Sequence, residues 1–330
     1  MKVAIFSTHH FEKPYLDLAV KKYPHEITYF DINLLAQTAQ NAKGFDAVCC
    51  FVSDQLNKDT IKILAKLGVK IISLRSAGFN HVDLQAAKEA NITVTRVPAY
   101  SPYAVAEFAV GLILSLNRKI HKAYNRTREH NFSLDGLLGF DLHGSTIGVI
   151  GTGKIGSVFS KIMLGFGCKV LATDPIENPD CLQIGVQYVS LQELCKKSDV
   201  ISLHCPYTPK TKHLINANTL ELMKPGVMII NTGRGALIDT KAVIKGLKTQ
   251  KIGYLGLDVY EEEENLFFRD LSEVIITDDI FMRLLTFPNV LITGHQAFFT
   301  KQALNNIELT SLANITAFEQ SKGEIFIVSV

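Results

Sequence analysis

The chain has 330 residues, of which 47% are hydrophobic and 20% are charged, and its formal net charge is +2. This length predicts two domains, and the supply of apolar side chains excludes an intrinsically disordered chain. The small net charge and the lack of a basic run argue against a nucleic-acid partner. No apolar run approaches the ~20 residues that a membrane span needs. The first ten residues, MKVAIFSTHH, predict a strand rather than a signal peptide, so we expect a cytoplasmic protein with no membrane partner.

Cysteine spacing gives no sign of a disulfide framework or a metal site. None of the six cysteines forms a C-x-x-C pair, and most lie in apolar stretches. We therefore expect buried, reduced thiols and no bound metal.

The first hundred residues alternate apolar, β-branched runs with amphipathic segments. The runs predict strands at 3–7, 27–31, 47–52, 70–76 and 92–97, and helices at 14–23, 59–68 and 82–91 lie between several of them. Such alternation is typical of a parallel sheet that is covered by helices on both faces.

A second alternating series follows one long apolar helix, which is predicted from about residue 101 to 129 and must be buried on several faces. Its strands are predicted to begin near residues 146, 168, 199, 227, 254 and 289, and the tail after residue 300 contains one more helix. The fold class is therefore α/β with two domains.

The sequence G-T-G-K-I-G at 151–156 has the strand–glycine–helix context of a dinucleotide site. Gly151 permits the tight turn, Gly153 allows the backbone to approach a pyrophosphate, and Gly156 allows the helix to pack closely on the strand. Asp174 ends the next strand, where its carboxylate can accept both ribose hydroxyls and would repel a 2′-phosphate. The motif therefore predicts NAD rather than NADP as the cofactor.

Three polar residues follow predicted strands and would suit hydride transfer to a keto acid. Arg234 lies between two glycines and offers a planar fork for a carboxylate, although a surface turn would also explain it. His295 is a candidate proton donor, with His204 as its rival. Glu263 lies in an acidic run that, taken alone, is typical of a solvated loop.

Several segments in chain order carry a resemblance to a known family. They are SAGFNHVDL, PAYSPYAVAEF, GVIGTGKIG, SDVISLHCPYTPKTKHLIN, MKPGVMIINTGRGALID, GLDVYEEEENLFF and LITGHQAF. Over essentially its whole length the chain resembles the D-isomer-specific 2-hydroxyacid dehydrogenases, and within them the bacterial fermentative D-lactate branch. The resemblance implies a Rossmann NAD-binding domain at 101–298, inserted into a flavodoxin-like α/β substrate domain made of 1–100 and 299–330.

The resemblance also implies a role for each site residue. Arg234 would bind the substrate carboxylate, His295 would donate the proton in the reduction of pyruvate to D-lactate, and Glu263 would hydrogen-bond the imidazole. Besides the three glycines, the expected NAD contacts are Lys154, Ile155, Asp174, Cys205, Pro206, Thr211, Thr232, Gly233, Arg234 and Asp258. On the substrate side it implies Ala77, Gly78, Tyr100 and Phe298.

Two alternatives stay open at this point. A related reductase acting on glyoxylate, hydroxypyruvate or a branched 2-keto acid belongs to the same class of enzyme. An NAD-sensing, corepressor-like scaffold is a different class that uses the same fold, since function follows the site and not the fold. The complete set of Arg234, Glu263 and His295 favours an enzyme, and the family predicts a homodimer or homotetramer.

Overall fold

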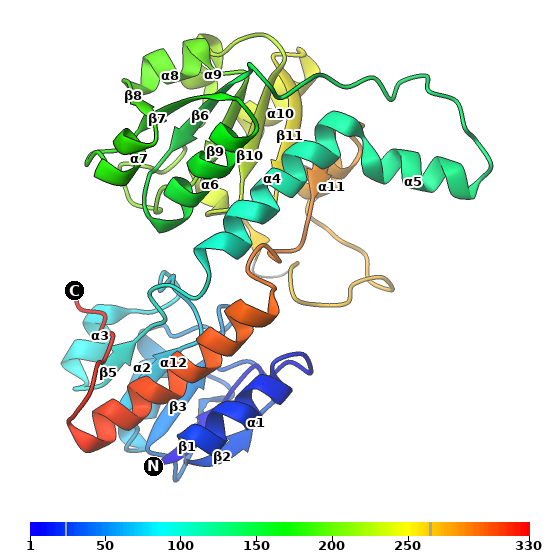
Figure 1. Cartoon of the computed structure of the whole chain (residues 1–330). Helices are drawn as coiled ribbons and strands as arrows, with labels where there is room; N and C mark the ends of the chain where they lie inside the picture. Colours follow the sequence, from blue (N-terminus) through cyan, green and yellow to red (C-terminus); the bar gives the residue numbers. More distant parts are fainter. Residues whose placement is uncertain (24, 264–265) are drawn as a thin grey trace. The chain divides into compact units, whose positions relative to one another are not determined.

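The computed structural model describes residues 1–23, 25–263 and 266–330. The chain divides into two compact units, one made of Met1–Ser101 with Phe299–Val330 and the other of Pro102–Phe298. Each unit is built around its own parallel sheet, and each is described by itself below (Figure 1).

The first unit contains a five-stranded parallel sheet in the order β2-β1-β3-β4-β5. Its strands are β1 (Lys2–Ile5), β2 (Glu26–Tyr29), β3 (Ala47–Cys50), β4 (Ile71–Leu74) and β5 (Thr93–Thr95). The helices are α1 (Lys13–Lys22), η1 (Ala39–Ala42), α2 (Lys58–Lys66), α3 (Leu84–Glu89) and α12 (Lys301–Gln320). This strand order is that of flavodoxin-like sheets.

Helices cover both faces of the first sheet. Successive side chains of a strand point to opposite faces, so each strand contributes to two apolar clusters. In β1, Val3 and Ile5 pack in one apolar cluster with residues of α1 and α12, whereas Ala4 packs in another with residues of α2 and α3. The C-terminal tail returns to this unit, where the Val328 backbone N–H donates to the Val94 carbonyl at 2.8 Å.

The second unit contains a seven-stranded parallel sheet in the order β12-β11-β10-β9-β6-β7-β8. Its strands are β6 (Thr146–Ile150), β7 (Lys169–Thr173), β8 (Gln187–Tyr188), β9 (Val200–Leu203), β10 (Val227–Asn231), β11 (Ile252–Leu257) and β12 (Val290–Ile292). The order reverses between β6 and β9, which is the topological switch point of a Rossmann sheet.

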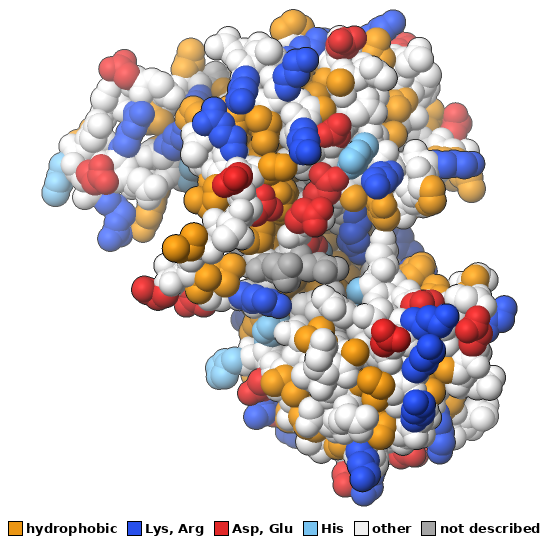
Figure 2. Space-filling view, turned by 180° about the vertical axis from the view of Figure 1, so that it is seen from behind, with side chains coloured by type: hydrophobic (Ala, Val, Ile, Leu, Met, Phe, Trp, Pro, Cys, Tyr) orange, Lys and Arg blue, Asp and Glu red, His pale blue; other side chains and the backbone are white. Residues whose placement is uncertain are grey.

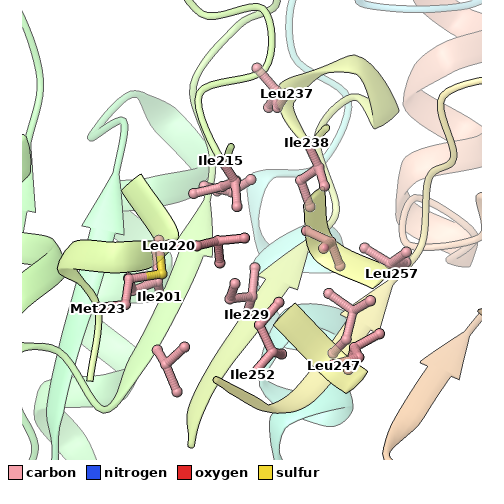
Figure 3. Packing of buried hydrophobic residues seen from close by; sticks show 14 of the residues in the cluster. Ile201, Ile215, Leu220, Met223, Ile229, Leu237, Ile238, Leu247, Ile252 and Leu257 are labelled. Atoms are coloured by element: carbon pink, nitrogen blue, oxygen red, sulfur yellow. The ribbon is translucent and has the colours of Figure 1, made fainter. Parts of the chain in front are cut away.

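Helices cover both faces of this sheet as well. They are α4 (Pro102–Arg118), α5 (Ile120–Arg128), α6 (Lys154–Gly165), α7 (Pro179–Gln183), α8 (Leu191–Lys197), α9 (Ala217–Leu222), η2 (Gly235–Leu237), α10 (Thr240–Lys248) and α11 (Asp279–Leu285). In β10, Ile229 packs in the cluster drawn in Figure 3, with residues of α9 and α10. Its neighbours Met228 and Ile230 pack in the opposite cluster with residues of α4 and α6.

The predicted α/β fold is confirmed, but two details of the sequence reading were wrong. The helix expected to run from 101 to 129 is two helices, because Lys119 adopts a left-handed conformation with φ of 50° between α4 and α5. The two-residue strand β8 was not predicted, since so short a run carries no periodic signal.

No helix in the described part of the chain is long and apolar enough to cross a membrane. All six cysteines are free thiols, and all but Cys205 are buried. On the face seen in Figure 2, Lys and Arg side chains are interspersed with acidic and hydrophobic ones.

Candidate active site

The candidate residues of the second unit gather at one edge of its sheet. The glycine motif follows β6, Asp174 follows β7, Cys205 follows β9, and Arg234 follows β10. The segments after β11 and β12 carry Glu263 and His295 respectively. Because all strands are parallel, their carboxyl ends lie at the same edge, where open α/β sheets bind ligands.

The glycine loop is shaped by close packing. A Cβ at Gly156 would lie 1.9 Å from the Gly151 carbonyl oxygen, and one at Gly151 would lie 2.6 Å from the Cys205 nitrogen. Gly151 also has a φ of +94°, which side chains disfavour. A Cβ at Gly153 would instead meet no atom of the described chain within 4 Å. Gly153 therefore leaves open space beside the start of α6, where the first backbone N–H groups have no helical acceptor.

Asp174 is held by the glycine loop. Its Oδ2 accepts hydrogen bonds from the backbone N–H of Thr152 at 2.7 Å and from the Thr152 hydroxyl at 3.3 Å. Its Oδ1 accepts one from the Ile176 N–H at 3.1 Å. Tyr188 donates to the Thr152 hydroxyl at 2.7 Å, so β8 braces this corner of the site. The carboxylate is thus fixed beside the glycine loop, at the carboxyl end of β7.

The predicted cofactor contacts beyond β9 and β10 contain one unsatisfied group. The buried hydroxyl of Thr232 has no hydrogen-bond partner among the described residues. A buried polar atom without a partner is costly, and a ligand that supplies one would remove the cost. Cys205 follows β9, the strand adjacent to β10 in the sheet, and burial raises the pKa of its thiol to about 11, so it is neutral. Thr211 donates its hydroxyl to the Pro206 carbonyl at 2.7 Å. These residues and the glycine loop fit a bound dinucleotide.

Arg234 lies in a turn that its neighbours fix. The buried Asn231 accepts from the Gly233 N–H at 3.0 Å and donates to the Arg234 carbonyl at 2.8 Å. A Cβ at Gly235 would lie 2.1 Å from the backbone of Tyr260, so this turn packs directly on the segment that leads to Glu263. The Arg234 side chain itself is half-buried and donates from Nη1 to the Gly233 carbonyl at 2.7 Å.

Glu263 and His295 form a partly buried pair. The Nδ1 of His295 lies 2.9 Å from Oε1 of Glu263, and Oε2 of Glu263 accepts the Tyr260 backbone N–H at 2.9 Å. The carboxylate is thus anchored on one side and faces the imidazole on the other, which leaves Nε2 of His295 for a reacting group. Glu264, the last member of the acidic run, lies outside the described residues.

Asp258 holds the loop that carries His295. It is fully buried, and its Oδ1 accepts from the Thr293 hydroxyl at 2.5 Å and from the Gln296 N–H at 2.9 Å. Its Oδ2 accepts from the Ala297 N–H at 2.8 Å, and its backbone carbonyl accepts from the His295 N–H at 2.8 Å. Burial raises the pKa of this carboxyl, while these hydrogen bonds oppose the rise. His295 therefore adopts its left-handed φ of 53° in a loop that hydrogen bonds to Asp258 hold in place.

His204, the rival histidine, is placed differently. Its ring packs on Phe159 with centroids 4.8 Å apart, and its Nε2 lies 2.8 Å from the Ser202 hydroxyl. Burial lowers the pKa of His204 to about 3, so the ring is neutral near pH 7. A neutral, packed histidine does not suit the role of proton donor.

The substrate-side residues of the first unit follow β4 and β5. Hydrogen bonds from the side chains of Arg96 and Ser76 occupy the carbonyl oxygens of Ala77 and Gly78 respectively. Among the described residues, the backbone N–H groups of Ala77 and Gly78 have no acceptor. Tyr100 is half-buried and accepts at its carbonyl from Asn306, and Phe298, at the end of the second unit, is half-buried.

Two supporting residues were not singled out from the sequence. Asn231 ends β10 and shapes the Arg234 turn, and Tyr188 supports the glycine loop. An asparagine at the buried end of an apolar strand is the signal that identifies such a turn. No comparable signal marks Tyr188, because its partner is 36 residues away in the chain.

Comparison with known proteins places this geometry in a family. Residues 110–297 match the model of the NAD-binding domain of the D-isomer specific 2-hydroxyacid dehydrogenases. The chain is 53% identical to the D-lactate dehydrogenase of Escherichia coli, with 98% of each chain covered.

Solved structures agree with this assignment. The apo-structure of Escherichia coli D-lactate dehydrogenase is similar with a TM-score of 0.89 at 50% identity, covering 98% of each chain. The structure of Aquifex aeolicus D-lactate dehydrogenase complexed with NAD and lactic acid has a TM-score of 0.86 at 37% identity, covering 97% of this chain and 96% of that one.

Proposed function

Since this chain belongs to the D-isomer specific 2-hydroxyacid dehydrogenases, and is thus an NAD-dependent oxidoreductase, we propose that it reduces pyruvate to D-lactate. The observation that carries the proposal is the Glu263–His295 pair beside the glycine-bounded Arg234 turn. The named activity of two similar proteins supports the choice of substrate. The same family also acts on other 2-hydroxy acids, so substrate choice is the part to be tested.

Arg234, His295 and Glu263 have different tasks in this mechanism. The Arg234 guanidinium binds the substrate carboxylate and polarises the keto oxygen. NADH, when bound, supplies the hydride that adds to the carbonyl carbon. His295 then gives the proton on Nε2 to the resulting alkoxide oxygen, which completes the hydroxyl. Glu263 bonds to Nδ1 of His295, which fixes the ring and keeps Nε2 available for the transfer.

We assign further contacts in line with the resemblance. The unpaired N–H groups of Ala77 and Gly78 would bind the substrate carboxylate, because adjacent backbone N–H groups form a site for an anion. Tyr100 would line the substrate side, and Phe298 would narrow the pocket toward a short substrate side chain such as a methyl group. Residues 1–100 and 299–330 would then be the substrate domain, and residues 101–298 the NAD domain.

The test is turnover of purified protein with NADH, followed as loss of absorbance at 340 nm. We expect the highest kcat/KM with pyruvate, and chiral analysis should find D-lactate as the product. A higher kcat/KM with glyoxylate, hydroxypyruvate or a branched 2-keto acid would refute the substrate assignment. No turnover with any 2-keto acid would refute the enzymatic proposal itself and favour an NAD-sensing scaffold.

We further propose that the protein is a homodimer or homotetramer. Figure 1 shows α5 and the segment after it extending away from the sheet of the second unit. This arm exposes large apolar side chains, with exposed fractions of 60% for Tyr124, 82% for Leu134 and 86% for Leu138. So much exposed apolar surface is typical of an interface. Light scattering should give at least twice the 36.5 kDa mass of one chain, and L134K/L138K should lower it.

A further inference from the structure

A second histidine–carboxylate pair lies beside the one assigned to catalysis. The Nε2 of His213 is 2.5 Å from Oε1 of Glu261, and Oε2 of Glu261 accepts the Thr240 hydroxyl at 2.9 Å. Both members of the pair are half-buried, with side-chain exposures of 35% and 24%. Glu261 precedes Glu263 by two residues, so the pair is built into the same loop as the catalytic carboxylate.

The backbone around His213 is bonded to the segment that follows Arg234. The N–H of His213 donates to the Ala236 carbonyl at 2.8 Å, and the N–H of Ile215 donates to the Leu237 carbonyl at 3.0 Å. His213 has a left-handed φ of 49°, which a non-glycine residue adopts only when its surroundings hold it. The His213 side chain therefore reaches Glu261 from a backbone already fixed to the Arg234 turn.

The Arg234 turn and the Glu261 segment also touch directly. A Cβ at Gly235 would lie 2.4 Å from the Glu261 nitrogen, which means that no side chain separates the two backbones there. Next to this contact, the two carboxylate oxygens of Glu261 bond to His213 and to Thr240. They join the loops that follow β9, β10 and β11.

Arg234 depends on such support. Within the described residues, its guanidinium makes a single hydrogen bond, from Nη1 to the adjacent Gly233 carbonyl, and no ion pair. Its side chain is therefore placed by the backbone of its turn. A shift of that turn against the Glu261–Glu263 segment moves the guanidinium relative to His295.

We propose that His213, Glu261 and Thr240 form a clamp of positioning residues, which sets the Arg234 turn against the loop of Glu263. The proposal rests on the role assigned to Arg234 above. In this arrangement His213 contacts neither the substrate nor the reacting atoms and acts only through Arg234. Its loss should weaken binding of the substrate carboxylate more than it slows proton transfer.

The test compares His213→Ala with wild type in steady-state assays with NADH and pyruvate. We expect the KM for pyruvate to rise about tenfold, because a misplaced binding group loses affinity steeply with distance. We expect kcat to fall by no more than about threefold. The Kd of NADH should stay at the wild-type value. His213→Gln should recover most of the KM, since its amide N–H can donate to Glu261.

The controls use exposed residues of the same kind. His130→Ala and Glu262→Ala alter an exposed histidine and the exposed neighbour of Glu261, and both should keep the wild-type KM. A double variant of His213→Ala and Glu261→Ala should raise the KM by less than the product of the two single effects.

Two results would overturn the clamp. One is a folded His213→Ala protein with the KM of wild type, and the other is a loss in which KM, kcat and NADH affinity change together with thermal stability. If His213→Ala does not fold, His213→Gln and Glu261→Gln decide the question through the same KM measurement. If wild type prefers another 2-keto acid, only the substrate assignment fails, and the clamp is measured with that acid.

Discussion

Replacing Asp258 with asparagine should loosen the loop that carries His295 while keeping the size of the side chain. Asp258 is fully buried and accepts three hydrogen bonds, from Thr293, Gln296 and Ala297. Asparagine offers one acceptor oxygen in place of two. Whichever way its amide is turned, the backbone N–H of Gln296 or of Ala297 faces an NH2 group and loses its acceptor.

The magnitude follows from these contacts. Leaving a buried N–H without an acceptor costs about 1–3 kcal/mol, and a hydrogen bond to a charged group contributes about 1.5–3 kcal/mol. Asparagine also avoids the desolvation that raises the pKa of Asp258, which offsets part of the loss. We expect a net decrease of about 2 kcal/mol in the free energy of unfolding. Displacement of His295 by a few tenths of an ångström or more should lower kcat by about 10- to 100-fold.

Urea denaturation and steady-state kinetics measure the two effects on the same protein. Asp141→Asn is the matched control, because Asp141 is an exposed carboxylate of the same unit. It should change neither quantity. An Asp258→Asn protein with the unfolding free energy and kcat of wild type would show that the three hydrogen bonds do not hold the histidine loop.

Four further predictions concern single side chains. His295→Ala should lower kcat by ~10²–10⁴ if His295 is the general acid, and near wild-type turnover would exclude that role. Glu263→Gln should lower kcat by about tenfold or more, because the imidazole of His295 loses the carboxylate that fixes its ring; a wild-type kcat would contradict the pairing. Asp174→Ala should reduce the ratio of kcat/KM for NADH over NADPH, and an unaltered ratio would place the ribose contact elsewhere. For His204 the folded-state pKa is about 3, below that of the unfolded chain, so its contribution to stability is present above pH 6.5 and is lost as the pH falls. The loss is at most about 1.4 kcal/mol per pH unit below 6.5. His204→Gln should therefore make the free energy of unfolding fall less steeply between pH 6 and 4. An equal slope of unfolding free energy against pH in both proteins would exclude this contribution.

Much of the fold could be predicted because its signals are local. The strand–glycine–helix pattern at 146–165 fixes β6, the tight turn and α6 from neighbouring residues alone. The break at Lys119 could not be predicted, because lysine has no intrinsic preference for a left-handed conformation. At the break, Lys119 contacts residues distant in sequence, since its Nζ donates to the Leu138 carbonyl and lies 5.6 Å from the centroid of the Tyr254 ring.

For the candidate site, the sequence predicted several residues but not their hydrogen-bond partners. Arg234, Glu263 and His295 follow strands in the sequence, but local sequence alone did not identify them as a site. Arg234 could have been a surface arginine, Glu263 part of a solvated acidic loop, and His204 the proton donor in place of His295. Only the order of the family's segments decided between these interpretations. Asp258 was expected as an NAD contact, and the identity of its hydrogen-bond partners required the structure. The pairing of His213 with Glu261 joins residues 48 positions apart and had no sequence signal.

By itself, the sequence determined the α/β class, the dinucleotide motif and the strand-end position of each reactive side chain. These follow from hydrophobic periodicity and from glycines at positions where a tight turn leaves no room for a side chain. Only the tertiary structure decided that Glu263 faces Nδ1 of His295, that His204 is packed and neutral, and that Asp258 ties down the histidine loop. The reason is that hydrogen bonds and burial are set by the adjacency of strands in the sheet, and residues distant in sequence meet only when that sheet has formed.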